Sequence, residues 1–311
     1  MRNRTRSVVV VAVTFLLTIA SAAQASPVAI ASPAAPQAAL QAAPQAVPQA
    51  APQETPADSS QSPSSSGVDI GDTLVSDIVA LGADALLLYG APARWTTRDW
   101  AIAGGATALG LGAMSVDDDV REVALRNQGV AGDAIAETAN WFGTWTPALA
   151  ISGGLYVTGL AFDWPVIRIA GRHVGQSVLY AGLLTTTIKV VAGRQRPLFD
   201  GGPFVFDPFT SDDSNHSFIS GHATLVFAIA SSLSADIDHP AATVGLYGLA
   251  SITGLSRIYT DRHWASDVIL GAAVGTACGY GVAHLHDALD PSGSSLLIVP
   301  GVDRLTMIWT F

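Results

Sequence analysis

Long apolar stretches recur after residue 70, and they restrict the folds open to this chain more than any other feature. They are rich in Ala, Gly, Leu and Thr, and they lack the alternation of apolar and polar residues that marks a half-buried strand. They lie at 73–90, 100–116, 144–162, 174–192, 222–236, 241–256 and 266–285. The pattern predicts an all-α fold, a multi-helix bundle in which the last six stretches are the six core helices.

The length of these stretches bears on whether the bundle lies in a membrane. Several are about 17 residues long, near the lower edge of the roughly 20 residues that a bilayer span requires. The chain is 49% hydrophobic and only 13% charged. We therefore expect the bundle to be embedded in a membrane, with a wholly soluble bundle as the alternative.

The first 25 residues carry the pattern of an export signal. A basic start, MRNRTR, precedes the apolar run SVVVVAVTFLLTIA and the small-residue sequence AAQA, which suits cleavage after Ala25. An uncleaved anchor is the alternative, and in either case the following chain is exported. Residues 26–66 are rich in Ala, Pro, Gln and Ser, which predicts a disordered linker. The helical domain is expected to cover 67–290.

The charges between the stretches predict an orientation. If the last six stretches span a membrane, one side carries Arg94, Arg98, Arg168 and Arg172, and the other carries the segment SVDDDV. The positive-inside rule places the arginines in the cytoplasm. A cleaved signal leaves the following chain outside, so 73–90 must then cross as well. A soluble domain in the periplasm is the alternative.

Three further features narrow the possibilities. The net charge of −10 argues against nucleic acid as a partner, since no basic face is available to cover a phosphate backbone. The tail, 291–311, has two short β-prone runs around PGVD, which predicts a C-terminal β-hairpin. The single cysteine, Cys278, lies among small residues, so we expect a packed side chain and not a reactive thiol.

Three polar segments interrupt the apolar helices, and the last of them, SRIYTDRHWASDV, is the most densely charged. Its His263 and Asp267 are four residues apart, so on a helix their side chains meet. A carboxylate there can accept the Nδ1 proton and leave Nε2 free to attack or to bind. Taken alone, the segment is equally consistent with a polar helix start that carries a surface ion pair.

The middle segment, SFISGHA, has the features of a helix start. Ser220 is a good N-cap, and Gly221 offers an unhindered N–H before an apolar helix. Free backbone N–H groups and the helix dipole favour an anion there, and His222 would lie beside it. A capped helix with an incidental histidine is the plainer interpretation of this segment alone.

The first segment, KVVAGRQRP, adds Lys189 and Arg196, which are two helical turns apart and can share one helix face. Together with Arg257 they place three fixed positive charges near a helix start and two histidines. Arginine forks and a lysine ammonium suit the oxygens of a phosphate group. Since unpaired buried cations are costly, a bound oxyanion is their expected counter-ion.

The order and spacing of the three segments resemble the type-2 phosphatidic acid phosphatase and vanadium haloperoxidase superfamily. That family has K-x6-R-P, then P-S-G-H, then S-R-x5-H-x3-D. This chain has the first pattern in full at 189–197 and the third in full at 256–267. The middle pattern departs from the family, because Ile219 stands where Pro is usual, although the S-G-H that follows is retained. The resemblance covers about residues 100–287.

The resemblance implies a role for each matching residue. His263 is implied to be the nucleophile that forms a phosphohistidine, with Asp267 orienting its ring. His222 is implied to protonate the leaving oxygen and then to activate water. The implied phosphate-binding residues are Lys189, Arg196, Ser220, Gly221 and Arg257. These fixed donors would take the part of a metal ion, so no metal is implied.

We therefore expect a metal-independent phosphatase that hydrolyses a phosphate monoester or pyrophosphate, most plausibly of a lipid, at the periplasmic face of the cell membrane. The partner would be a phosphorylated lipid or a small phosphate ester. A soluble periplasmic acid phosphatase of broad specificity is one alternative. A vanadate-dependent haloperoxidase, in which His263 coordinates the metal, is another, and vanadate is a cofactor only in that case.

Two acidic segments outside the motifs receive weaker predictions. The segment DDDVRE, 117–122, is expected to be a solvated helix start and not a metal site. The segment 197–216 is expected to be a long loop, which serves either as a lid that shapes specificity or as a surface cover. The histidines lack the local spacing typical of a zinc site.

Overall fold

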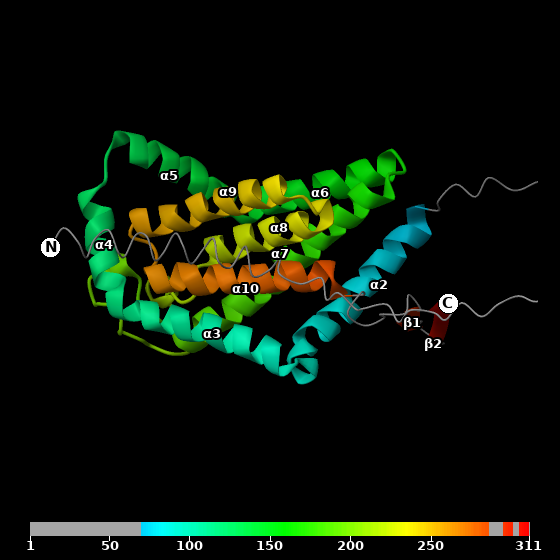
Figure 1. The fold of residues 1–311 in the computed structure, drawn as a ribbon, viewed down its shortest axis with the longest axis horizontal. Coiled ribbons are helices and arrows are strands. Elements are labelled where there is room, and N and C mark those ends of the chain that lie inside the picture. The colour runs from blue at the N-terminus through cyan, green and yellow to red at the C-terminus, as the bar shows by residue number, and fades with distance from the viewer. Residues whose placement is uncertain (1–69, 286–294, 301–304, 311) are drawn as a thin grey trace, which may run out of the picture.

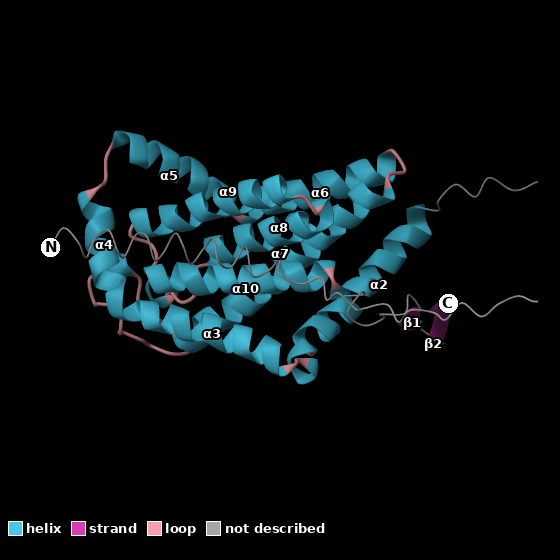
Figure 2. Ribbon diagram, viewed as in Figure 1, coloured by secondary structure: helices cyan, strands magenta, loops and turns pink. Residues whose placement is uncertain are grey.

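The computed structural model describes residues 70–285, 295–300 and 305–310, and its main part is a helical bundle (Figures 1 and 2). The predicted signal peptide, 1–25, and linker, 26–66, lie outside the described residues. The α-helices are α2 (Ile70–Tyr89), α3 (Thr97–Ala113), α4 (Asp117–Arg126), α5 (Val130–Phe142), α6 (Trp145–Ala161), α7 (Pro165–Ala192), α8 (Gly221–Ile237), α9 (Pro240–Tyr259) and α10 (Ala265–Ala283). Short 3-10 turns are η1 (Ala91–Arg94), η2 (Met114–Val116), η3 (Pro197–Phe199) and η4 (Asp213–Asn215).

The all-α prediction is confirmed for the bundle, and each of the seven apolar stretches lies on a helix. The apolar stretches do not predict α4 and α5, because these two helices are shorter and carry several polar residues. They also place the start of α7 too late. That helix begins at Pro165, where proline suits the first helical turn because its missing N–H would have no helical partner.

The end of α7 directs the chain towards the polar segments. The helix stops at Gly193, which has a φ of +60°. A Cβ atom there would lie 1.8 Å from the carbonyl oxygen of Asp207, so only glycine fits. The chain then passes through the loop 194–220 to Ser220, whose side chain accepts a hydrogen bond from the N–H of Ala223 and caps α8.

Helix α8 is the centre of the bundle, packed between α7, α9 and α10. Three glycines on one face of α10 allow that helix to approach it closely. A Cβ at Gly271, Gly275 or Gly279 would lie 2.2 to 2.6 Å from a backbone oxygen of α8 or its cap. The close approach brings the start of α8 against the start of α10, where the N–H of Ser220 donates to the carbonyl of Asp267 at 3.0 Å.

The outer faces of the bundle carry many exposed large apolar side chains. Examples are Leu86, Ile102, Leu109, Leu149, Val157, Leu183, Val244 and Leu249. Among the described helices, α7 and α10 are long and apolar enough to cross a bilayer, although 67% of the α10 window is buried inside the bundle. The expectation that six helices cross a membrane stays a prediction.

The C-terminal strands β1 (Ser295–Pro300) and β2 (Leu305–Thr310) pair in antiparallel register, with Ser295 opposite Thr310. Residues 301–304, which connect them, lie outside the described residues. The predicted hairpin appendage therefore stays a prediction, and the bundle is the part of the fold that positions the candidate site.

Candidate active site

The three polar segments meet at one end of the bundle. The end of α7, the start of α8, the end of α9 and the start of α10 all lie on the side where α4 is found (Figure 1). Contacts between segments agree with this view. The Nζ of Lys189 donates to the carbonyl of His216 at 2.6 Å, and the N–H of His263 donates to the carbonyl of Arg257 at 3.2 Å.

The ring of His263 is held in one tautomer by the backbone. Its Nδ1 lies 2.9 Å from the carbonyl oxygen of Ser217. Because a carbonyl oxygen can only accept, Nδ1 carries the proton and Nε2 keeps its lone pair. The side chain is only 3% exposed. The structure thus presents an oriented imidazole with its second nitrogen unprotonated, as a nucleophile requires.

Asp267 lies close to His263 but does not accept its Nδ1 proton. The nearest carboxylate oxygen is 3.8 Å from Nδ1, and it accepts hydrogen bonds from the Ser217 hydroxyl and the Trp264 N–H. The sequence spacing suggested a direct bond. In the structure the carboxylate of Asp267 acts through Ser217. It accepts a hydrogen bond from the Ser217 hydroxyl, and the Ser217 carbonyl in turn orients the His263 ring.

A buried guanidinium that the sequence reasoning missed anchors Asp267. Arg194 is fully buried and forms ion pairs with Asp267 at 2.7 Å and with Asp117 at 2.8 Å. Asp117 also accepts from the N–H and hydroxyl of Ser266, at the start of α10. Two carboxylates from distant segments thus share one arginine beneath the histidine.

This network corrects the interpretation of DDDVRE as a solvated helix start. Asp117, its first residue, is 1% exposed. Burial raises the pKa of its carboxyl group, and this effect outweighs the hydrogen bonds from Ser266 and Arg194, which lower the pKa. Arg121 of the same segment makes two contacts with the carboxylate of Asp261, at 2.7 and 2.8 Å. The segment therefore braces the loop that carries His263. The one feature of the sequence that could have indicated this role is the run of three adjacent aspartates in a chain with few charged residues.

Each predicted phosphate-binding cation is held by one or two residues and keeps further donors. Lys189 also approaches the carbonyl of Ser217, at 3.4 Å. Arg196 pairs with the largely exposed Asp213 at 2.8 Å. Arg257 donates from one terminal nitrogen to the side-chain oxygen of Asn140 at 2.7 Å, and its buried Nε has no partner among the described residues.

The start of α8 lies against these cations. Gly221 is the first residue of the helix, and a Cβ there would be 3.7 Å from the Cε of Lys189. Its neighbour His222 packs against Gly143, where a Cβ would lie 2.6 Å from the ring. The ring nitrogens of His222 make no hydrogen bond to any described residue. The first N–H groups of a helix also lack helical partners, so they are available to an anion.

The electrostatics of the site keep His263 neutral. Burial lowers its pKa well below the ordinary value of 6.5, and the charges of Lys189, Arg257, Arg196 and His222 act in the same direction. An anion bound among these cations would offset their effect. Among the described residues, no three His, Cys, Asp or Glu side chains gather as a metal site would need.

This shift makes a prediction about stability and pH. Between the lowered folded pKa and 6.5 the unfolded chain binds more protons at His263, so stability is lost as pH falls below about 6.5. His263→Asn keeps a donor for the Ser217 carbonyl and removes the titration. We expect its melting temperature to fall less than that of the wild type between about pH 7.5 and about pH 5. Equal losses in the two proteins would contradict a lowered pKa.

The comparisons with known proteins match the part of the chain that carries the three motifs. Residues 170–290 match the model of the PAP2 superfamily. The PAP2 match contains all three motifs and extends from α7 to the end of α10, whereas Asp117, Arg121 and Asn140 lie before it.

The chain is also similar to curated lipid A 1-phosphatases. It is 34% identical over 144 residues to that of Rhizobium etli, which covers 43% of this chain and 61% of the relative. It is 28% identical over 239 residues to that of Porphyromonas gingivalis, which covers 75% of this chain and 48% of the relative. The matches thus span about half of each relative's length.

Two solved structures align with this chain at 18% sequence identity. A transmembrane PAP2 type phosphatidylglycerolphosphate phosphatase from Bacillus subtilis has a TM-score of 0.46, covering 69% of this chain and 98% of that one. LpxE from Aquifex aeolicus has a TM-score of 0.40, covering 53% of this chain and 92% of that one.

Proposed function

We propose that this protein is a phosphatase of membrane lipids that removes a terminal phosphate through a phosphohistidine intermediate. The observation that carries the proposal is the oriented, unprotonated Nε2 of His263 beside three cations and a helix start. The match of residues 170–290 to the PAP2 superfamily model and the similarity to lipid A 1-phosphatases support it.

In the first step, the phosphate oxygens are held by Lys189, Arg196 and Arg257, and by the N–H groups at the start of α8. The Nε2 lone pair of His263 attacks phosphorus, and the bond from phosphorus to the ester oxygen breaks. Burial and the neighbouring cations lower the pKa of His222 to about 3, and the negative charge of a bound phosphate opposes that effect. In this scheme His222 is protonated once the phosphate is bound, and it gives its proton to the departing oxygen. The fixed cations stabilise the charge on the equatorial oxygens as it redistributes.

In the second step, water attacks the phosphohistidine. His222, now neutral, accepts a proton from this water, the bond between phosphorus and Nε2 breaks, and inorganic phosphate leaves. The Ser217 carbonyl keeps the Nδ1 proton of His263 in place throughout, so the ring returns to its starting tautomer. The protein's own cations supply the charge stabilisation in this scheme, and metal independence stays a prediction.

The substrate class follows from the surroundings of the site. Aliphatic side chains on the outer faces of the bundle, such as Leu183 on α7 and Leu249 on α9, suit a lipid environment. A bundle placed in a membrane would meet lipid phosphates by lateral diffusion. The relatives make the 1-phosphate of lipid A the first substrate to examine. The site would face the periplasm if the positive-inside prediction holds.

The proposal is tested by phosphate release from a panel of substrates. Lipid A, phosphatidate, phosphatidylglycerol phosphate and p-nitrophenyl phosphate are offered to the detergent-solubilised full chain, with Lys189→Met as the inactive control. We expect the highest kcat/KM for a lipid phosphate. Preference for the soluble ester would contradict a lipid phosphatase, and vanadate-dependent bromide oxidation without phosphate release would favour a haloperoxidase.

A further inference from the structure

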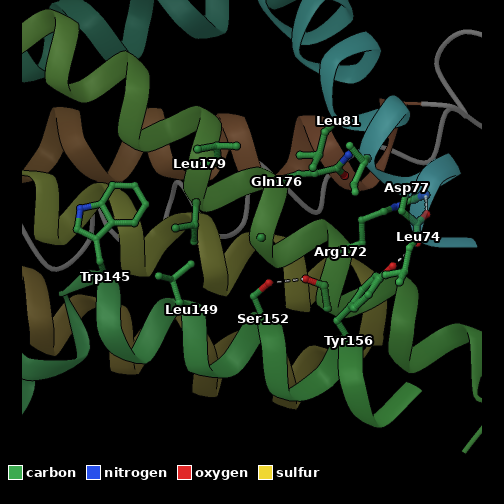
Figure 3. A pocket seen from close by; sticks show the side chains of 14 residues that line it. Leu74, Asp77, Leu81, Trp145, Leu149, Ser152, Tyr156, Arg172, Gln176 and Leu179 are labelled. Carbon is green, nitrogen blue, oxygen red and sulfur yellow. Dashed lines mark hydrogen bonds and ion pairs between the residues drawn. The ribbon is translucent and has the colours of Figure 1, made fainter. Parts of the chain in front are cut away.

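A cavity that is open to the surface lies between α2, α6 and α7, and it has a volume of about 340 Å³ (Figure 3). Most of its lining is apolar, and it includes Leu74, Ile78, Leu81, Trp145, Leu149 and Leu179. This volume falls within the range of small-molecule sites, and the lining suits a hydrocarbon chain.

Two guanidiniums share one carboxylate at one end of the cavity. Asp77 forms ion pairs with both Arg168 and Arg172, and its carboxylate also accepts from the hydroxyl of Tyr156. The buried carboxyl group of Asp84, two helical turns further along α2, accepts a hydrogen bond from Gln176 of the lining. The Nε of Arg172, a residue that lines the cavity, is buried and has no hydrogen-bond partner among the described residues.

The polar end of the cavity is separate from the candidate active site, whereas its apolar end, at Trp145, is two residues from Gly143, against which His222 packs. Arg172 lies near the start of α7 and Lys189 near its end, 17 residues later, which is about 25 Å along a helix. A single ligand headgroup cannot reach both places. The inference therefore stands whether or not the proposed phosphatase function is correct.

We propose that this cavity binds an anionic amphiphile, with its hydrocarbon chain between α2, α6 and α7 and its headgroup at Arg172. A guanidinium fork pairs well with the oxygens of a carboxylate or phosphate. An anion there would pair with the guanidinium of Arg172 and accept from its Nε, which has no partner among the described residues. In Figure 3 the leucines and Trp145 continue from this polar end along the helices, as an attached chain would require.

The test uses dodecanoate as the probe and the full chain in dodecyl maltoside, with binding followed by native mass spectrometry. Arg172→Met keeps an apolar stem and leaves Asp77 paired with Arg168 and Tyr156. We expect it to weaken dodecanoate binding at least tenfold. Arg126→Met, which removes an exposed arginine on α4, is the matched control and should bind as the wild type does.

A second pair of variants keeps every charge in place. Leu81→Trp enlarges a half-buried side chain of the lining and should also weaken binding at least tenfold, whereas Leu249→Trp, an exposed position on α9 outside the cavity, should not. Loss of binding in Lys189→Met with retention in Arg172→Met would put the probe in the candidate active site and overturn the proposal. Equal binding of the neutral amphiphile dodecanol, with the same dependence on Arg172, would also overturn it.

Discussion

Replacing His263 with alanine is expected to abolish phosphoenzyme formation and to lower kcat/KM at least about 10⁴-fold, because no other described group offers an oriented, unprotonated nitrogen to the phosphate. His222→Ala should behave differently. It should lower turnover while phosphoenzyme accumulates, provided the substrate has a good leaving group that needs no proton. Rapid acid-free quenching of a reaction with a ³²P-labelled substrate measures the covalent species in both variants.

A histidine outside the site provides the control for these variants. His239 is exposed and caps α9, and His239→Asn retains a side chain suited to that cap. This variant should keep wild-type turnover. Covalent phosphate on the His263→Ala protein, or an equal block of phosphorylation by both active-site substitutions, would contradict the assigned roles.

The second large effect concerns stability. Arg194→Met removes the only cation that directly pairs with Asp117 and Asp267 among the described residues, and it leaves two carboxylates buried in the bundle. Breaking such a buried network costs about 3 to 5 kcal/mol. We expect the variant to unfold at a much lower denaturant concentration than the wild type, or to fail to accumulate.

Arg126→Met is the comparison for this prediction, because it breaks an exposed pair with Glu122 that contributes little. A triple variant, Arg194→Met with Asp117→Asn and Asp267→Asn, removes the buried charges together. It should recover part of the lost stability without recovering activity. If Arg194→Met and Arg126→Met were equally stable, the buried network would not hold the site together.

The sequence predicted the bundle and the chemical groups of the site because both depend on local patterns. Apolar stretches of helical length mark the core, and three short motifs with fixed spacing contain His222, His263 and the three cations. Their roles stay predictions, but the structure places them at one end of the bundle.

The supporting residues could not be predicted because they are brought together only by folding. Arg194 and Asp117 are 77 residues apart, and Arg257 and Asn140 are 117 apart. No spacing rule connects such pairs. The four-residue spacing of His263 and Asp267 even suggested a direct bond, whereas α10 begins only after His263, so the two residues do not share a helical turn.

The pairing of Arg194 with Asp117 has a consequence for where this protein can be divided. The match to the PAP2 family model begins at residue 170, yet one of the two carboxylates that pair with Arg194 comes from α4, more than fifty positions upstream. The boundary of the family-model match is therefore not the boundary of the unit that holds the site. A fragment that began at residue 170 would retain all three motifs, but it would lack Asp117, one of the two carboxylates that pair with Arg194.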